Sequence, residues 1–133
     1  MGAELRIAIA TDADIVTARQ EGRRWASSLP FSASDLTVIA TAISEVARNI
    51  VSYAGSGEVI IRVVERAGRK GVDIEARDSG PGIPDVRLAL QDGYSTSGSL
   101  GLGLPGVRRL MDEFDIRSAV NGGTIVSMRL WTR

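Results

Sequence analysis

The order of strand-like and helix-like segments most constrains what this chain can fold into. Residues 4–10 alternate between apolar and polar side chains, which is the period of a half-buried strand. Apolar residues then recur every three or four positions over 12–28 and again over 34–53, and Pro30 lies between the two runs. The first half of the chain therefore predicts one strand followed by two helices.

The second half predicts two hairpins. The paired strand-like segments are 58–65 with 72–77, and 114–120 with 124–131. Short helices are expected at 84–91 and 102–111, with a polar, glycine-punctuated loop at 92–99. Consecutive hairpins mixed with helices predict an α+β fold, a two-layer sandwich of a mixed, mostly antiparallel sheet with helices on one face. The absence of regular strand-helix-strand alternation argues against a Rossmann sheet, and we expect a single domain over 1–133.

Composition removes several classes of function. Sixteen basic and sixteen acidic residues cancel, so no charge footprint favours nucleic acid or an anionic membrane. The chain has no cysteine and no histidine, which excludes disulfides, thiol or imidazole metal ligands and a phosphohistidine. No apolar run approaches the ~20 residues that span a bilayer, and we expect a soluble cytoplasmic protein.

An acidic residue followed by two glycines lies after the strand-like run 72–77. The sequence reads Asp78, Ser79, Gly80, Pro81, Gly82. Glycine permits close approach and positive φ, so this pattern suits a flat or phosphorylated ligand lying directly on the main chain. A plain surface turn is the alternative, because Pro-Gly pairs mark turns in general.

A second glycine cluster occupies residues 100–107, where a loop enters a predicted helix. Its central members are Gly101 and Gly103. Free backbone amides at a helix N-terminus bind phosphate oxygens well, although these glycines would also fit a loop in which they serve only turns. Neither a Walker A lysine pattern nor a strand-first G-x-G-x-x-G is present, so P-loop and dinucleotide folds do not explain the cluster.

Two polar residues share one face of the second predicted helix. Glu45 and Asn49 are four positions apart in an otherwise apolar helix. An amide oxygen is a hard ligand suited to magnesium, and a carboxylate one turn earlier could accept a proton from an attacking hydroxyl or water. The alternative is a solvated helix face that carries a Glu45–Arg48 ion pair.

Thr124 follows Gly123 at the start of the last predicted strand. This position would put its hydroxyl beside the carboxylate of Asp78. Most threonines that follow a glycine turn only begin a strand, so both interpretations stay open at this point.

Taken in order, these motifs resemble the ATP-binding site of the GHKL superfamily. An E-x-x-x-N helix, then D-x-G-x-G, then a loop ending in G-x-G, then G-T on a late strand is the arrangement shared by gyrase-type ATPases, sensor histidine kinases and bacterial anti-sigma kinases. The resemblance covers residues 34–131 and implies the Bergerat ATP-binding fold. A histidine kinase is disfavoured because the chain has no histidine and no dimerisation helices.

The resemblance implies roles for the polar residues, with ATP and Mg²⁺ as cofactors. Asn49 would coordinate the magnesium ion that bridges the phosphates. Glu45 would be the general base, and Asp78 would accept a hydrogen bond from the adenine amino group. Thr124 would support the adenine end beside Asp78.

It also implies roles for the backbone and the apolar walls. Gly80 and Gly82 would let the base lie against the main chain. Gly101, Leu102 and Gly103 would hold phosphates at the end of an ATP lid over 92–100. The expected apolar walls are Ile83, Ala47 and Leu104, and the candidate cations for the γ-phosphate are Arg48, Arg108 and Arg109.

Within the superfamily, the segments 44–50, 92–96 and 100–114 look like the RsbT-type switch kinases of the bacterial stressosome. That family would phosphorylate serine or threonine on STAS-domain partners and, once released, activate a partner serine phosphatase in a general stress sigma-factor cascade. The alternatives are an anti-sigma factor or a non-catalytic, ATP-gated binding module. Glu45 favours the kinase, because a binding module has no need of a base.

Overall fold

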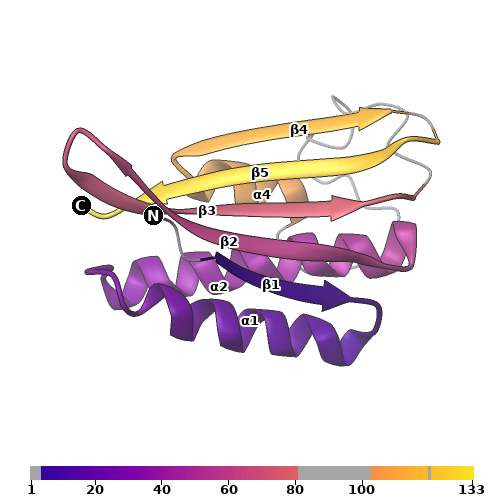
Figure 1. Cartoon of the computed structure of the whole chain (residues 1–133), viewed down its shortest axis with the longest axis horizontal. Coiled ribbons are helices and arrows are strands. Elements are labelled where there is room, and N and C mark those ends of the chain that lie inside the picture. Colours follow the sequence, from indigo (N-terminus) through magenta and orange to yellow (C-terminus); the bar gives the residue numbers. More distant parts are fainter. Residues whose placement is uncertain (1–3, 81–102, 120) are drawn as a thin grey trace.

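The computed structural model describes residues 4–80, 103–119 and 121–133 (Figure 1). Its strands are β1 (Glu4–Ile9), β2 (Gly57–Arg66), β3 (Arg69–Asp78), β4 (Glu113–Ala119) and β5 (Gly123–Trp131). Its helices are α1 (Asp12–Ala26), α2 (Ala33–Asn49), the π-helix η1 (Ile50–Ala54) and α4 (Gly103–Leu110).

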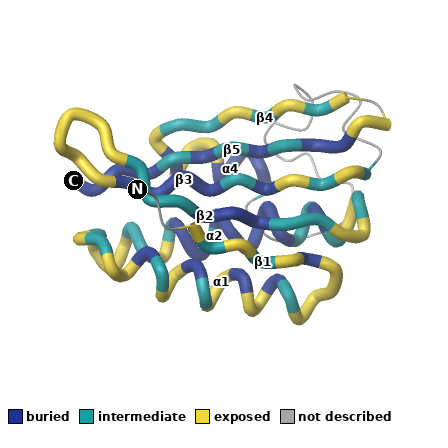
Figure 2. The backbone as a smooth tube through the Cα atoms, viewed as in Figure 1, coloured by how far each residue is buried: buried dark blue, intermediate teal, exposed yellow. Residues whose placement is uncertain are grey.

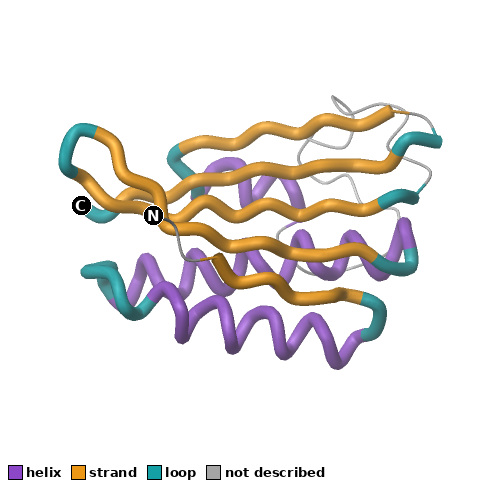
Figure 3. Tube along the Cα trace, viewed as in Figure 1, coloured by secondary structure: helices purple, strands orange, loops and turns teal. Residues whose placement is uncertain are grey.

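The five strands form one sheet in the order β1-β2-β3-β5-β4, and all four pairings are antiparallel. The helices lie against one face of this sheet, and α1 and α2 run side by side (Figures 1 and 3). The predicted α+β two-layer fold is confirmed. The sequence predicted a mixed, mostly antiparallel sheet. Every pairing among the described strands is antiparallel.

The core lies between the sheet and α2, which has more buried residues than any other described helix (Figure 2). Inward-facing strand residues meet the apolar stripe of α2. Fully buried members include Ile39, Ile43 and Val46 of α2, Val59 and Ile61 of β2, Val72 and Ile74 of β3, and Met128 and Leu130 of β5. Because α2 is held along its length, both its last turn and the strand ends opposite it have fixed positions.

The second helix departs from the single run expected over 34–53. α2 ends at Asn49, and the chain continues as η1, in which the amide of Gly55 donates to the carbonyl of Ile50 over 2.9 Å. This bond spans five residues instead of four, so the last turn is wider than an α-turn. The predicted helix at 84–91 and loop at 92–99 lie outside the described residues.

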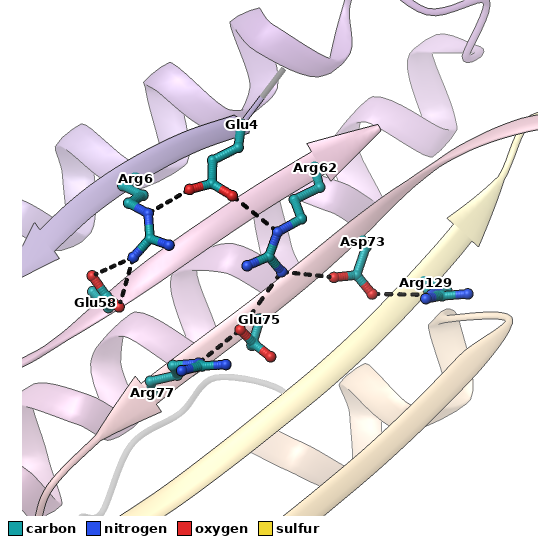
Figure 4. A network of polar contacts seen from close by, with 8 residues as sticks. All are labelled: Glu4, Arg6, Glu58, Arg62, Asp73, Glu75, Arg77 and Arg129. Carbon is teal, nitrogen blue, oxygen red and sulfur yellow. Dashed lines mark hydrogen bonds and ion pairs between the residues drawn. The ribbon is translucent and has the colours of Figure 1, made fainter. Parts of the chain in front are cut away.

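The face of the sheet opposite the helices carries a network of alternating charges (Figure 4). Arg62 is its centre, with ion pairs to Glu4 at 3.1 Å and to Asp73 and Glu75 at 3.6 Å each. Asp73 continues the network to Arg129 at 3.0 Å. The guanidinium groups of Arg62 and Arg129 are about one third exposed, and ion pairs that water reaches are individually worth little, so we expect this network mainly to keep this face of the sheet polar.

The β2–β3 hairpin closes through a strained two-residue turn. Ala67 and Gly68 have φ values of 52° and 79°, which is the left-handed region. A two-residue hairpin turn of this kind favours asparagine or glycine at both positions, because a left-handed alanine brings its Cβ close to the following carbonyl. Asn121 occupies the same region at φ 62° in the β4–β5 turn.

Ala67→Asn should therefore stabilise the protein. We expect its free energy of unfolding to rise by about 0.5–1 kcal/mol, because asparagine adopts the left-handed conformation more readily than alanine. The measurement is urea denaturation of both proteins. Asn121→Ala makes the reverse change at the other left-handed position and should lower the free energy of unfolding. Equal stability of all three proteins would show that Ala67 is not strained.

Candidate functional site

Asp78 ends β3 and lies between two neighbouring strands. Its register partners are Gly57 on β2 and Thr124 on β5. One carboxylate oxygen, Oδ1, accepts hydrogen bonds from the backbone amides of Gly80, at 3.0 Å, and Thr124, at 3.2 Å. Within the described part of the chain no hydrogen bond involves Oδ2, so this oxygen can accept a donor from a ligand.

Two glycines allow the backbone to close around Asp78. A Cβ at Gly57 would lie 2.2 Å from the carbonyl oxygen of Arg77, and one at Gly123 would lie 2.1 Å from that of Asp78. Neither position therefore tolerates a side chain without movement of the main chain. Sequence reasoning missed Gly57. The sequence shows only a glycine next to a predicted strand, and its pairing with Asp78 follows from the register of the folded sheet.

The π-helix brings the end of the second helix to the same place. A Cβ at Gly80 would lie 2.6 Å from Cβ of Ala54, the last residue of η1, so η1 packs directly on the turn after Asp78. π-Turns are frequent at functional sites. Asn49 is the residue before η1 and is half-buried. Figure 1 shows the ends of β3 and of α2 with η1 at the same end of the molecule.

Glu45 is buried on α2, with 5% of its surface exposed. Its Oε1 accepts a hydrogen bond from Nη1 of Arg48 at 2.7 Å, and its Oε2 accepts one from the backbone amide of Gly103 at 3.3 Å. The ion pair expected from a solvated helix face is present, but the face is not solvated at Glu45. The contact with Gly103 joins residues that are 58 positions apart in the sequence.

Thr124 lies beside Asp78 and contacts it through its backbone amide, which donates a hydrogen bond to Oδ1 of Asp78. Its hydroxyl lies 3.0 Å from the hydroxyl of Ser118 on β4, instead of meeting the carboxylate as the sequence suggested. Ser118 was missed by sequence reasoning, because only the β4–β5 register places it opposite Thr124.

Of the other predicted residues, some lie in the described part of the chain and some lie outside it. Gly103 opens α4 with φ of 67°, and Leu104 and Ala47 lie in the hydrophobic core. Of the candidate cations, Arg48 pairs with Glu45, whereas Arg108 and Arg109 are exposed on α4. Gly82, Ile83, Gly101 and Leu102 lie outside the described residues.

The donor set fits a nucleotide better than a stable protein-only metal centre. The bare backbone around Asp78 and the open Oδ2 suit a flat base with an amino group. Across the described ranges no three acidic residues converge to hold a metal ion. Asn49 supplies one hard oxygen, which is the kind of ligand that magnesium takes together with phosphate oxygens.

None of the described helices is long and apolar enough to cross a membrane.

Comparisons with known proteins identify the family of the chain. Residues 8–130 match the model of the histidine kinase-like ATPase domain family. The chain is 53% identical to the serine/threonine-protein kinase RsbT of Bacillus subtilis, over 96% of each chain. It is 32% identical to the anti-sigma F factor of Geobacillus stearothermophilus, over 79% of this chain and 75% of that protein.

A solved structure supports the fold. The mycobacterial sensor histidine kinase MprB superimposes with a TM-score of 0.59 at 19% identity, covering 100% of this chain and 99% of that one. The expected resemblance is thus confirmed, and membership of an ATPase family implies ATP binding. The chain belongs to the family of histidine kinase-like ATPase domains and is a serine/threonine-protein kinase.

Proposed function

We propose that this kinase phosphorylates serine or threonine on STAS-domain partners of a stressosome, in the cytoplasm. Once released from them, it activates a partner serine phosphatase in a general stress sigma-factor cascade. Support comes from the 53% identity with RsbT and from the motifs that resemble RsbT-type switch kinases. The single observation that carries the catalytic part is the 3.3 Å contact between Glu45 and the amide of Gly103.

That contact matters because it places a buried carboxylate next to the start of α4, where the glycine cluster would hold phosphates. A base for phosphoryl transfer must lie near both the acceptor hydroxyl and the transferred group. The other buried acid of the described chain is Asp73. It lies in the charge network on the opposite face of the sheet and is therefore not near the start of α4.

In the proposed reaction Glu45 accepts the proton of the partner's hydroxyl. The hydroxyl oxygen forms a bond to the γ-phosphorus of ATP, and the bond from that phosphorus to its bridging oxygen breaks, which leaves ADP. Asp78 holds the adenine amino group through Oδ2. Asn49 would hold Mg²⁺, which supplies positive charge to the phosphates when bound. Gly80, Gly82 and Ile83 would line the base, while Gly101, Leu102 and Gly103 would bind phosphates and Leu104 would form a wall.

Asp78→Asn should weaken ATP binding. Asparagine can keep Oδ1 and its two backbone bonds, but it then presents an amide donor where Oδ2 was, facing the adenine amino group. We expect a loss of about 1–3 kcal/mol in the binding free energy. Equilibrium titration with ATP measures it. Asp115→Asn, on exposed β4, is the matched control and should bind as the wild type does. Wild-type affinity in Asp78→Asn would rule out the proposed adenine contact.

Glu45→Ala should retain ATP binding and lose phosphotransfer, because it removes the proton acceptor and no proposed nucleotide contact. Glu45→Gln should behave alike while filling the same space, which separates lost chemistry from a packing defect. Transfer of radiolabel from γ-labelled ATP to a STAS-domain protein is the measurement. Glu21→Gln, on the exposed part of α1, serves as the control. Labelling at the wild-type rate by Glu45→Gln would show that Glu45 is not the base.

A second candidate is an anti-sigma factor or ATP-gated binding module, favoured by the 32% identity with an anti-sigma F factor. In this alternative, nucleotide would expose or hide a partner surface. The same labelling experiment separates the two: partner binding that depends on ATP without transfer of label would favour the module.

A further inference from the structure

The ion pair between Arg48 and Glu45 differs from an ordinary helical pair in its surroundings. The two residues are three positions apart on α2, and Nη1 of Arg48 lies 2.7 Å from Oε1 of Glu45. The Glu45 side chain is 7% exposed and that of Arg48 is 38% exposed. The carboxylate is thus removed from water, while the guanidinium reaches it from the edge of the protein.

The chain contains a built-in comparison. Glu21 and Arg24 on α1 have the same spacing and the same order of charges, but their atoms are 3.6 Å apart and their side chains are 42% and 75% exposed. Exposed pairs of this kind contribute little, because water solvates both partners. A buried carboxylate that loses its cation has no such compensation.

The second oxygen of Glu45 is held from another element. Oε2 accepts a hydrogen bond from the backbone amide of Gly103 at 3.3 Å. Each carboxylate oxygen therefore has its own donor, Oε1 from α2 and Oε2 from the start of α4. Two donors on different oxygens fix the plane of a carboxylate, which one donor does not. Of the two, only Arg48 acts through a side chain and is therefore open to substitution.

We propose that Arg48 is a positioning residue that orients the Glu45 carboxylate toward the acceptor hydroxyl. The inference rests on the proposed role of Glu45 as the base. It assigns Arg48 a task different from direct contact with the γ-phosphate. A phosphate contact would chiefly affect nucleotide affinity, whereas misorientation of the base affects the chemical step.

The test compares Arg48→Gln and Arg48→Lys with the wild type, well below their unfolding temperatures. Arg48→Gln should lower kcat for phosphate transfer to a STAS-domain protein by about 10- to 100-fold, as small misplacements of reacting groups do, with Kd for ATP unchanged. Arg48→Lys should recover part of kcat, since it keeps the charge. Arg24→Gln, from the exposed pair on α1, should leave both constants unchanged.

Three outcomes would overturn the proposal. A higher Kd for ATP with unchanged kcat would make Arg48 a nucleotide contact, and no change in either constant would make the pair irrelevant to turnover. Equal loss of residual kcat by Arg48→Gln in the wild-type and Glu45→Gln backgrounds would also overturn it, because Arg48 would then act independently of Glu45.

Failure of the proposed function itself is distinguishable. If the wild type transfers no phosphate to a STAS-domain protein, the proposed function fails, and the pair is then tested by thermal unfolding. Arg48→Gln should lower Tm in the wild type and much less in Glu45→Gln, because the neutral side chain no longer needs a cation. An equal drop of Tm in both backgrounds would show that the two side chains are not coupled.

Discussion

The antiparallel pairing of β3 with both β2 and β5 is the constraint on which the candidate site depends. It puts Gly57, Asp78 and Thr124 in one row across the sheet. The backbone then satisfies one oxygen of Asp78 with amides of Gly80 and Thr124. Without this row, a carboxylate at a strand end would be an ordinary solvated group, with no reason to present one defined oxygen to a ligand.

The helical layer fixes the second half of the site. The apolar stripe of α2 is buried against the sheet, and Glu45, near the end of this helix, is therefore buried as well. A buried carboxylate requires donors, and Arg48 and the amide of Gly103 supply them. The packing of α2 thereby ties the proposed base to α4. The charged face of the sheet serves a different purpose, since its network lies on the other side and its arginines are accessible to water.

Much of the fold was predictable because it rests on local periodicity. The alternation of 4–10 and the 3.6-residue period of 34–53 each depend on neighbours in the sequence; the strand was confirmed, and the helix was confirmed as far as Asn49. The change to a π-helix at Ile50 was not predictable from that period. It accompanies the contact of Ala54 with Gly80, a residue more than twenty positions away. The same holds for Gly57 and Ser118, which matter only through strand register.

The sequence by itself determined which chemical groups are available and in which order: a chain without histidine or cysteine, an acid and an amide one helical turn apart, and glycines after a strand-ending acid. Tertiary structure alone decided that Glu45 is buried, that it meets Gly103, and that Thr124 contacts Asp78 through its amide while its hydroxyl pairs with Ser118. The physical reason is that residue types and spacings are local properties. Burial and hydrogen-bond partners depend instead on segments that only the packed sheet and helices bring together.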